Sequence, residues 1–175
     1  MKETVDIPEG VEADYEDGVL KVEKDDREVE KKLEHAQVEV EVGDGEVKFS
    51  TDSDRKEVKS IVGTFRSHLG NMLEGLEEDH VYRLKGVYAH FPMTIKQQGD
   101  EIHIENFMGE RHPRIIDVMD NVEVSIDGDD LELRSPDKEA VSQTAARVEQ
   151  ACKKGNRDPR TFQDGVYIVE GDTSE

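Results

Sequence analysis

The sequence has one cysteine, no tryptophan and few aromatic residues. Cys152 stands alone among 175 residues, so neither an internal disulfide nor a cysteine-based metal site can form. Aromatic residues make up 5% and hydrophobic residues 34%, so any core must be built mostly from Val, Ile and Leu. No run approaches the roughly 18 apolar residues of a transmembrane helix, and the start, MKETVDIPEG, is polar. These absences predict a soluble intracellular protein with no membrane partner.

Positive charge is also scarce. The chain has 43 Asp and Glu against 23 Lys and Arg, a formal net charge of -20. The acids alternate with apolar residues, as in VEVEV from Val38 to Val42, which is typical of solvated strand faces and not of an acidic tail. Self-repulsion opposes compaction, but the screening length falls to ~3 Å at ~1 M salt. We therefore expect a salt-rich cytoplasm, as in halophilic archaea, with an ordinary acidic cytosolic protein as the alternative.

An internal repeat organises the chain. VEVEVGDGEVKFSTDSDRKEV from Val38 resembles VEVSIDGDDLELRSPDKEAV from Val122, and LKVEKDDREVEKKL from Leu20 more weakly resembles TIKQQGDEIHIENF from Thr94. Each copy reads as alternating strands with Gly-Asp turns, followed by a helix. We expect an α+β fold with two tandem similar domains, each an antiparallel β-sheet covered by one α-helix, in the order β-β-β-β-α. The predicted domains are residues 1–82 and 83–175.

Hydrophobic spacing places one helix in each repeat. The first apolar stripe recurs at steps of three and four and comprises Val58, Ile61, Val62, Phe65, Leu69, Met72, Leu73 and Leu76. The second is narrower and comprises Ala140, Val141, Thr144, Ala145, Val148 and Cys152. We expect Asp52 or Ser53 to cap the start of the first helix.

The sequence carries no signature of catalysis. None of the six histidines lies at the i, i+4 metal spacing with a partner on a helix. DGDD from Asp127 has the wrong offsets for a calcium loop and reads as a hairpin turn. No glycine-rich phosphate loop follows a strand, and no G-x-S-x-G motif occurs. We expect no enzyme activity, no metal and no cofactor.

Two segments are more basic than the rest of the chain. Residues 147–160 hold five basic and two acidic residues, a net charge of +3, and ENFMGERHPR from Glu105 also concentrates basic residues. Gly155 and Asn156 suit a turn whose backbone N–H groups approach phosphates. Phe107 and Phe162 lie beside the two clusters, and we expect them to pack in the core, although such rings can also stack on unpaired bases. The segments indicate nucleic-acid binding, with a plain solvated loop as the alternative.

Three stretches carry a family resemblance: IENFMGERHPR from Ile104, GVYAHFPM from Gly86 and RDPRTFQDGVYI from Arg157. Together with the repeat they resemble the L six (L6) family of large-subunit ribosomal proteins, in its archaeal and eukaryotic form, over essentially the whole chain. The resemblance implies a structural constituent of the cytoplasmic ribosome that binds large-subunit ribosomal RNA near the stalk base and the sarcin-ricin loop. Neighbouring ribosomal proteins would be partners, translation factors would dock nearby, and no DNA would be bound.

The resemblance also implies site residues in the second domain. Carried over by position, the RNA contacts are Asn106, Gly109, Arg111, His112, Arg114, Lys153, Lys154, Arg157 and Arg160. Packing and turn formation by Phe162, Asp164 and Gly165 would support the second loop. The alternative left open by the residues is a protein-protein adaptor whose first repeat adds a partner strand at an exposed sheet edge.

Overall fold

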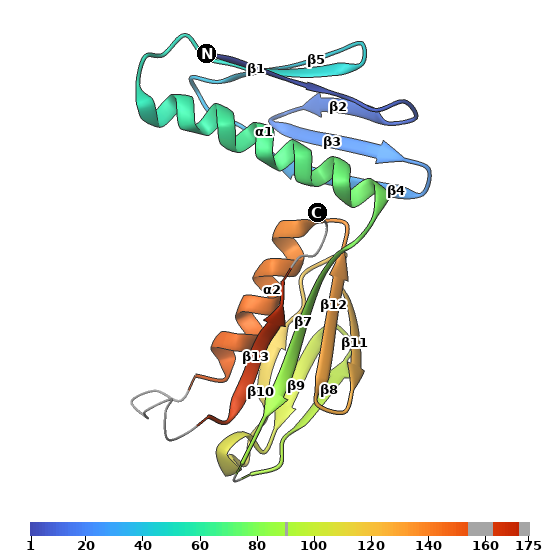
Figure 1. The fold of residues 1–175 in the computed structure, drawn as a ribbon, viewed down its shortest axis with the longest axis vertical. Helices are drawn as coiled ribbons and strands as arrows, with labels where there is room; N and C mark the ends of the chain where they lie inside the picture. Colours follow the sequence, from blue (N-terminus) through green and yellow to red (C-terminus); the bar gives the residue numbers. More distant parts are fainter. Residues whose placement is uncertain (90, 154–162, 172–175) are drawn as a thin grey trace. The chain divides into compact units, whose positions relative to one another are not determined.

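Antiparallel strands and one α-helix make up each of two units of the chain, Met1–Asp79 and His80–Glu175, in the computed structural model (Figure 1). The structure describes residues 1–89, 91–153 and 163–171. Sheet and helix occur in the same order in both units, which confirms the predicted α+β fold of two tandem similar domains. Strand β7 (His80–Val87) runs through the position between residues 82 and 83 that the sequence predicts as the domain boundary.

The N-terminal unit has six strands followed by a helix. They are β1 (Lys2–Asp6), β2 (Glu12–Glu16), β3 (Val19–Lys24), β4 (Arg27–Lys32), β5 (Glu39–Gly43), β6 (Glu46–Ser50) and α1 (Lys56–Glu77). The strands form two antiparallel sheets in the orders β1-β6-β5 and β2-β3-β4. Helix α1 packs against strands of both sheets, so one core lies between the helix and all the strands (Figure 1).

The C-terminal unit repeats this pairing and adds a strand. Its described elements are β7, β8 (Thr94–Gln98), β9 (Glu101–Glu105), β10 (Arg114–Asp117), β11 (Glu123–Asp127), β12 (Asp130–Ser135), α2 (Lys138–Ala151) and β13 (Gly165–Glu170), with a short 3-10 turn at Phe107–Gly109. The sheets have the orders β11-β12-β7-β13 and β10-β9-β8. Strand β13 extends the first sheet beside β7, at an edge that has no counterpart in the N-terminal unit.

The number of strands per repeat differs from the prediction. Each repeat has six strands before its helix, and not the four predicted. The prediction missed β1 and β2 in the first repeat and β7 and β10 in the second. The weaker sequence match was wrong by one strand, since the pairing makes β3-β4 equivalent to β9-β10 and not to β8-β9. Short strands such as KETVD and RIID have too few alternating apolar residues to be recognised locally. Strand β1 is held by pairing with the distant β6, whereas β10 pairs with β9, the strand before it in the chain.

The predicted apolar stripe of α1 forms the core of the N-terminal unit. Its buried residues are Val58, Val62, Phe65, Leu69, Met72 and Leu76, and Ile61 and Leu73 are partly buried against them. The rings of Phe65 and Phe49 meet edge to face, with centroids 6.1 Å apart and an interplanar angle of 66°. This contact joins the helix to β6. The edge-to-face arrangement is one that aromatic pairs favour.

The ends of α1 depart from the expected capping. The N-cap residue is Arg55, which makes no side-chain cap bond, so the prediction of Asp52 or Ser53 was wrong. Ser53 Oγ instead accepts the Arg55 N–H at 3.2 Å. This hydrogen bond forms a local turn, which competes with a helix that would begin earlier in the chain. At the other end, Arg27 Nη1 donates to the Gly75 carbonyl and to Asp79 Oδ1, both at 2.8 Å. A cation from β4 thus faces the negative end of the helix dipole.

Helix α2 buries the narrow stripe that the sequence predicts. Ala140, Val141, Thr144, Ala145, Val148 and Cys152 are all buried. Asp137 caps the helix by accepting the N–H groups of Glu139 and Ala140 at 3.0 and 3.3 Å. Burial raises the pKa of the Cys152 thiol to about 11. The side chain therefore acts as a small core residue and stays protonated near neutral pH.

Removal of the Phe65 ring should destabilise the N-terminal unit strongly. Phe65→Ala should lower the free energy of unfolding by about 3 to 5 kcal/mol, because it removes buried apolar surface and leaves a cavity beside Phe49. Urea unfolding followed by circular dichroism measures this change. The matched control is Glu74→Ala on the exposed face of α1, which should change stability by no more than about 0.5 kcal/mol. A loss below about 1 kcal/mol for Phe65→Ala would contradict the core position.

Candidate nucleic-acid interface

A tight turn between β9 and β10 presents the first basic cluster. Asn106, Met108 and Gly109 have positive φ angles of 60°, 55° and 76°, so much of the turn is in the left-handed region. This conformation suits Asn and Gly but costs roughly 1 to 2 kcal/mol at Met108. Asn106 Nδ2 donates to the Pro92 carbonyl at 2.9 Å, and the Glu110 N–H donates to the Phe107 carbonyl at 3.0 Å. The surrounding contacts therefore hold the turn in one strained shape.

Phe107 lies under this turn as part of the core. Its side chain is 1% exposed, which confirms core packing as its role. The Arg114 guanidinium lies over its ring, with the central carbon 4.5 Å from the ring centroid. The contact is a cation–π interaction between the turn and the first residue of β10.

Arg114 joins the turn to the end of α2. Its Nη2 and Nε donate to the two carboxylate oxygens of Glu110 at 2.7 and 3.1 Å. Its Nη1 donates to the Ala151 carbonyl and, at 3.2 Å, to the Lys153 carbonyl. The hydrogen bonds between the two side chains raise the pKa of Arg114 and lower that of Glu110. The two predicted RNA-binding segments are thus joined through one side chain, and most donors of Arg114 bind within the protein.

Three other described residues among the predicted RNA contacts have exposed side chains. Arg111 and His112 follow the glycine turn, and both side chains are exposed. Lys153 is also exposed, directly after α2. These three residues are accessible to an anionic ligand, whereas Arg114 is partly buried. The predictions for Lys154, Arg157, Arg160 and Phe162 lie outside the described residues.

Asp164 and Gly165 follow the second basic segment in the chain, and the structure describes the contacts of both. Asp164 is fully buried, and its Oδ1 accepts the Ala89 N–H at 3.1 Å. Gly165 begins β13 and pairs with Val87 on β7. The carboxylate thus fastens the end of the loop to the segment that follows β7. No local pattern indicates that Arg114 reaches the carbonyls of Ala151 and Lys153, or that Asp164 reaches Ala89, because these partners lie tens of residues away along the chain.

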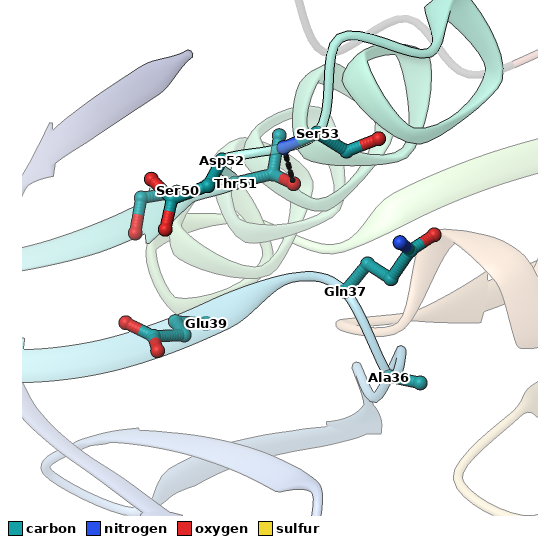
Figure 2. A pocket seen from close by; sticks show the side chains of 7 residues that line it. All are labelled: Ala36, Gln37, Glu39, Ser50, Thr51, Asp52 and Ser53. Atoms are coloured by element: carbon teal, nitrogen blue, oxygen red, sulfur yellow. Dashed lines mark hydrogen bonds between the residues drawn. The ribbon is translucent and has the colours of Figure 1, made fainter.

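A separate pocket of about 390 Å³ lies in the N-terminal unit. It is lined by Ala36, Gln37, Glu39, Ser50, Thr51, Asp52 and Ser53 (Figure 2). Figure 2 shows the Ser53 N–H donating to Thr51 Oγ1, at 3.1 Å, within the link from β6 to α1. The charged lining residues are Glu39 and Asp52. Two carboxylates repel phosphate, so this pocket does not suit a nucleic-acid backbone.

Within the described ranges, no group of three or more His, Cys, Asp or Glu side chains is placed to hold a metal ion. Neither α1 nor α2 is long and apolar enough to cross a membrane, and the same holds for every helix in the described part of the chain.

Comparison with known proteins matches the chain to the family described as ribosomal protein L6, over residues 7–79 and 91–165. A large ribosomal subunit protein uL6 from Archaeoglobus fulgidus is 47% identical over 138 residues, covering 79% of this chain and 70% of the relative. The uL6 protein of Methanosarcina mazei is 41% identical over 167 residues, covering 95% of each chain. That of Methanobrevibacter smithii is 38% identical over 169 residues, covering 97% of this chain and 95% of the relative.

The ion pair between Glu110 and Arg114 should make stability depend on acidic pH. The pKa of Glu110 lies below its ordinary value of 4.5 because Arg114 donates to the carboxylate. The pair therefore stabilises the folded protein above that ordinary value, and this stabilisation is lost as the pH falls through the lowered pKa. Because both side chains are partly exposed, Glu110→Gln should cost only about 0.5 to 1 kcal/mol at pH 7.

Urea unfolding of both proteins at a series of pH values and fixed salt checks this expectation. The difference between the wild type and Glu110→Gln should disappear as the pH falls through the lowered pKa of Glu110. Glu123→Gln, which changes an exposed carboxylate on β11, is the matched control and should have little effect at any pH. A difference that persists undiminished at low pH would contradict the role of the pair.

Proposed function

This chain belongs to the ribosomal protein L6 family, and we propose that it binds large-subunit ribosomal RNA near the stalk base, the sarcin-ricin loop and the translation-factor site. As a member of this family it is a structural constituent of the large ribosomal subunit in the cytoplasm, and it is not an enzyme. Ribosomal RNA and other ribosomal proteins are therefore its partners. The RNA contacts and the position near the factor site are the parts that we propose.

The observation that carries the proposal is the rigid turn at residues 106–112. It presents Arg111 and His112 to solvent on a strained backbone that hydrogen bonds hold in place. Arg114 connects this turn to the carbonyl of Lys153, where the second basic segment begins. We propose that Asn106, Gly109, Arg111, His112 and Lys153 contact the RNA. Lys154, Arg157 and Arg160 extend the same interface in sequence.

The net charge of the chain makes fixed contacts necessary. Diffuse attraction to phosphates depends on counterion release and weakens steeply as salt rises. A chain of net charge -20 also repels RNA at long range. Affinity must therefore come from short hydrogen bonds made by positioned arginine and backbone groups. The turn between β9 and β10 provides such groups without a generally basic surface.

We propose that the N-terminal unit serves another surface of the assembly. Residues 1–82 carry a net charge of -13, against -7 for residues 83–175. The charged residues that line its pocket are acidic. This unit should face solvent or neighbouring ribosomal proteins, while the C-terminal unit provides the RNA interface.

Substitution of arginines in the two basic segments should weaken RNA binding. Arg111→Ala, and separately Arg157→Ala with Arg160→Ala, should each reduce affinity for deproteinised large-subunit ribosomal RNA by roughly tenfold or more, because charge-assisted hydrogen bonds to phosphate are removed. The dependence of log affinity on log salt should become shallower by about 1 for each phosphate that the variant no longer binds. Filter binding of the full chain over a salt series measures both quantities.

The matched control for these variants is Arg134→Ala. Arg134 lies on β12 in the same unit and pairs with Glu132. Its substitution should leave affinity and salt dependence unchanged. Unchanged affinity in both the Arg111 and the Arg157 and Arg160 variants would contradict the proposed interface.

We further propose that the protein works in a salt-rich cytoplasm. Raising KCl from 0.1 to 1 M shortens the screening length from ~10 to ~3 Å, so self-repulsion among the acids falls and the free energy of unfolding should rise. Urea unfolding at each salt concentration measures this rise. Glu39→Gln with Glu41→Gln on β5 removes two negative charges and should reduce the salt dependence. Equal stability at both concentrations would contradict the proposal.

A further inference from the structure

Phe91 is the most exposed aromatic ring among the residues that the structure describes. It lies between β7 and β8, and 41% of its surface is exposed. Phe107, the aromatic residue within the basic segment itself, is 1% exposed beneath the Arg114 guanidinium. Phe107 cannot reach a ligand without opening the core. Phe91 can do so without any rearrangement.

The Phe91 ring is seated on the glycine turn. A Cβ atom added at Gly109 would lie 3.1 Å from Phe91 Cε1 and 3.2 Å from Cδ1, so the ring lies directly against this backbone. The next residue is held as well, because Asn106 Nδ2 donates to the Pro92 carbonyl at 2.9 Å. Gly109 also has a φ of +76°, which residues with a side chain rarely adopt. Both this backbone angle and the nearby ring therefore favour glycine at this position. The ring is thus supported by the turn while part of its surface stays open.

The charges beside the ring favour a nucleotide as the ligand. Arg111 and His112 follow Gly109 in the chain, and both are exposed. An aromatic ring held against a turn that carries an exposed arginine matches an unpaired nucleotide, whose base stacks on the ring while its phosphate binds the guanidinium. A protein partner would favour a wider apolar patch without charges at its centre. Preorganisation lowers the entropic cost of binding, since the turn already holds the ring.

We propose that Phe91 is a base-stacking residue, whose ring binds the face of an unpaired base of large-subunit ribosomal RNA beside the turn at residues 106–112. The inference rests on the proposed RNA-binding function and names one kind of contact within it. Stacking requires the ring and not its bulk. Tyr at this position keeps the flat face, whereas Leu keeps only apolar volume.

The test compares Phe91→Leu and Phe91→Tyr in the full chain by filter binding to deproteinised large-subunit ribosomal RNA. Phe91→Leu should weaken affinity by roughly 5- to 150-fold, the usual effect of losing one stacked base. Its salt dependence should match the wild type, because every phosphate-binding group is retained, and Phe91→Tyr should keep nearly full affinity. Val169→Ala, which truncates another exposed apolar side chain on β13, is the matched control and should bind normally. Thermal unfolding by circular dichroism verifies that each variant is folded.

Wild-type affinity in Phe91→Leu, or equal losses in Phe91→Leu and Phe91→Tyr, would overturn the stacking role. If Arg111→Ala weakens binding while Phe91→Leu does not, only this inference fails. If the wild-type chain binds ribosomal RNA no better than transfer RNA, the proposed function fails with it. A photo-crosslinking residue at position 91 in reconstituted large subunits gives an independent readout: attachment to an unpaired nucleotide supports stacking, and attachment to a protein overturns it.

Discussion

The candidate interface depends on the contacts that the guanidinium of Arg114 makes within the protein. It binds both carboxylate oxygens of Glu110, lies over the ring of Phe107 and donates to carbonyls at the end of α2. One rigid planar cation thereby joins the β9–β10 turn, the core and the start of the second basic segment. Lysine could not replace it, because an ammonium lacks the planar fork and the flat face that these contacts use together.

The division of roles among the basic residues follows from this arrangement. Arg114 uses its donors inside the protein, so it orients the turn, while Arg111 and His112 remain exposed for a ligand. Asp164 has the corresponding role at the other end of the second loop, where it accepts the N–H of Ala89. Residues that belong to one basic cluster in the sequence therefore divide into supporting and exposed groups. An acidic protein can bind RNA in this way because a few oriented donors replace a broad positive field.

The duplicated fold has been used differently in its two halves. Both units pair six strands in the same order and cover them with one helix. Only the C-terminal unit has the additional strand β13, which ends the second basic segment and lies beside β7. The N-terminal unit keeps the sheet and helix but carries the larger share of the negative charge. A common scaffold thus supplies stability in both halves, while the turns and the added strand distinguish the interface.

The sequence by itself determined the features that local pattern encodes. The apolar stripes of α1 and α2, the Gly-Asp hairpins, the absence of catalytic motifs and the family-specific segments could all be read from neighbouring residues, because helical and strand periodicity are short-range properties. Tertiary structure alone decided that further strands such as β1 and β7 exist, because both pair with strands far away along the chain. It also decided that Arg114 faces inward, and that Phe91 and not Phe107 is exposed. These outcomes depend on contacts between residues far apart in the chain, whose energies no local pattern contains.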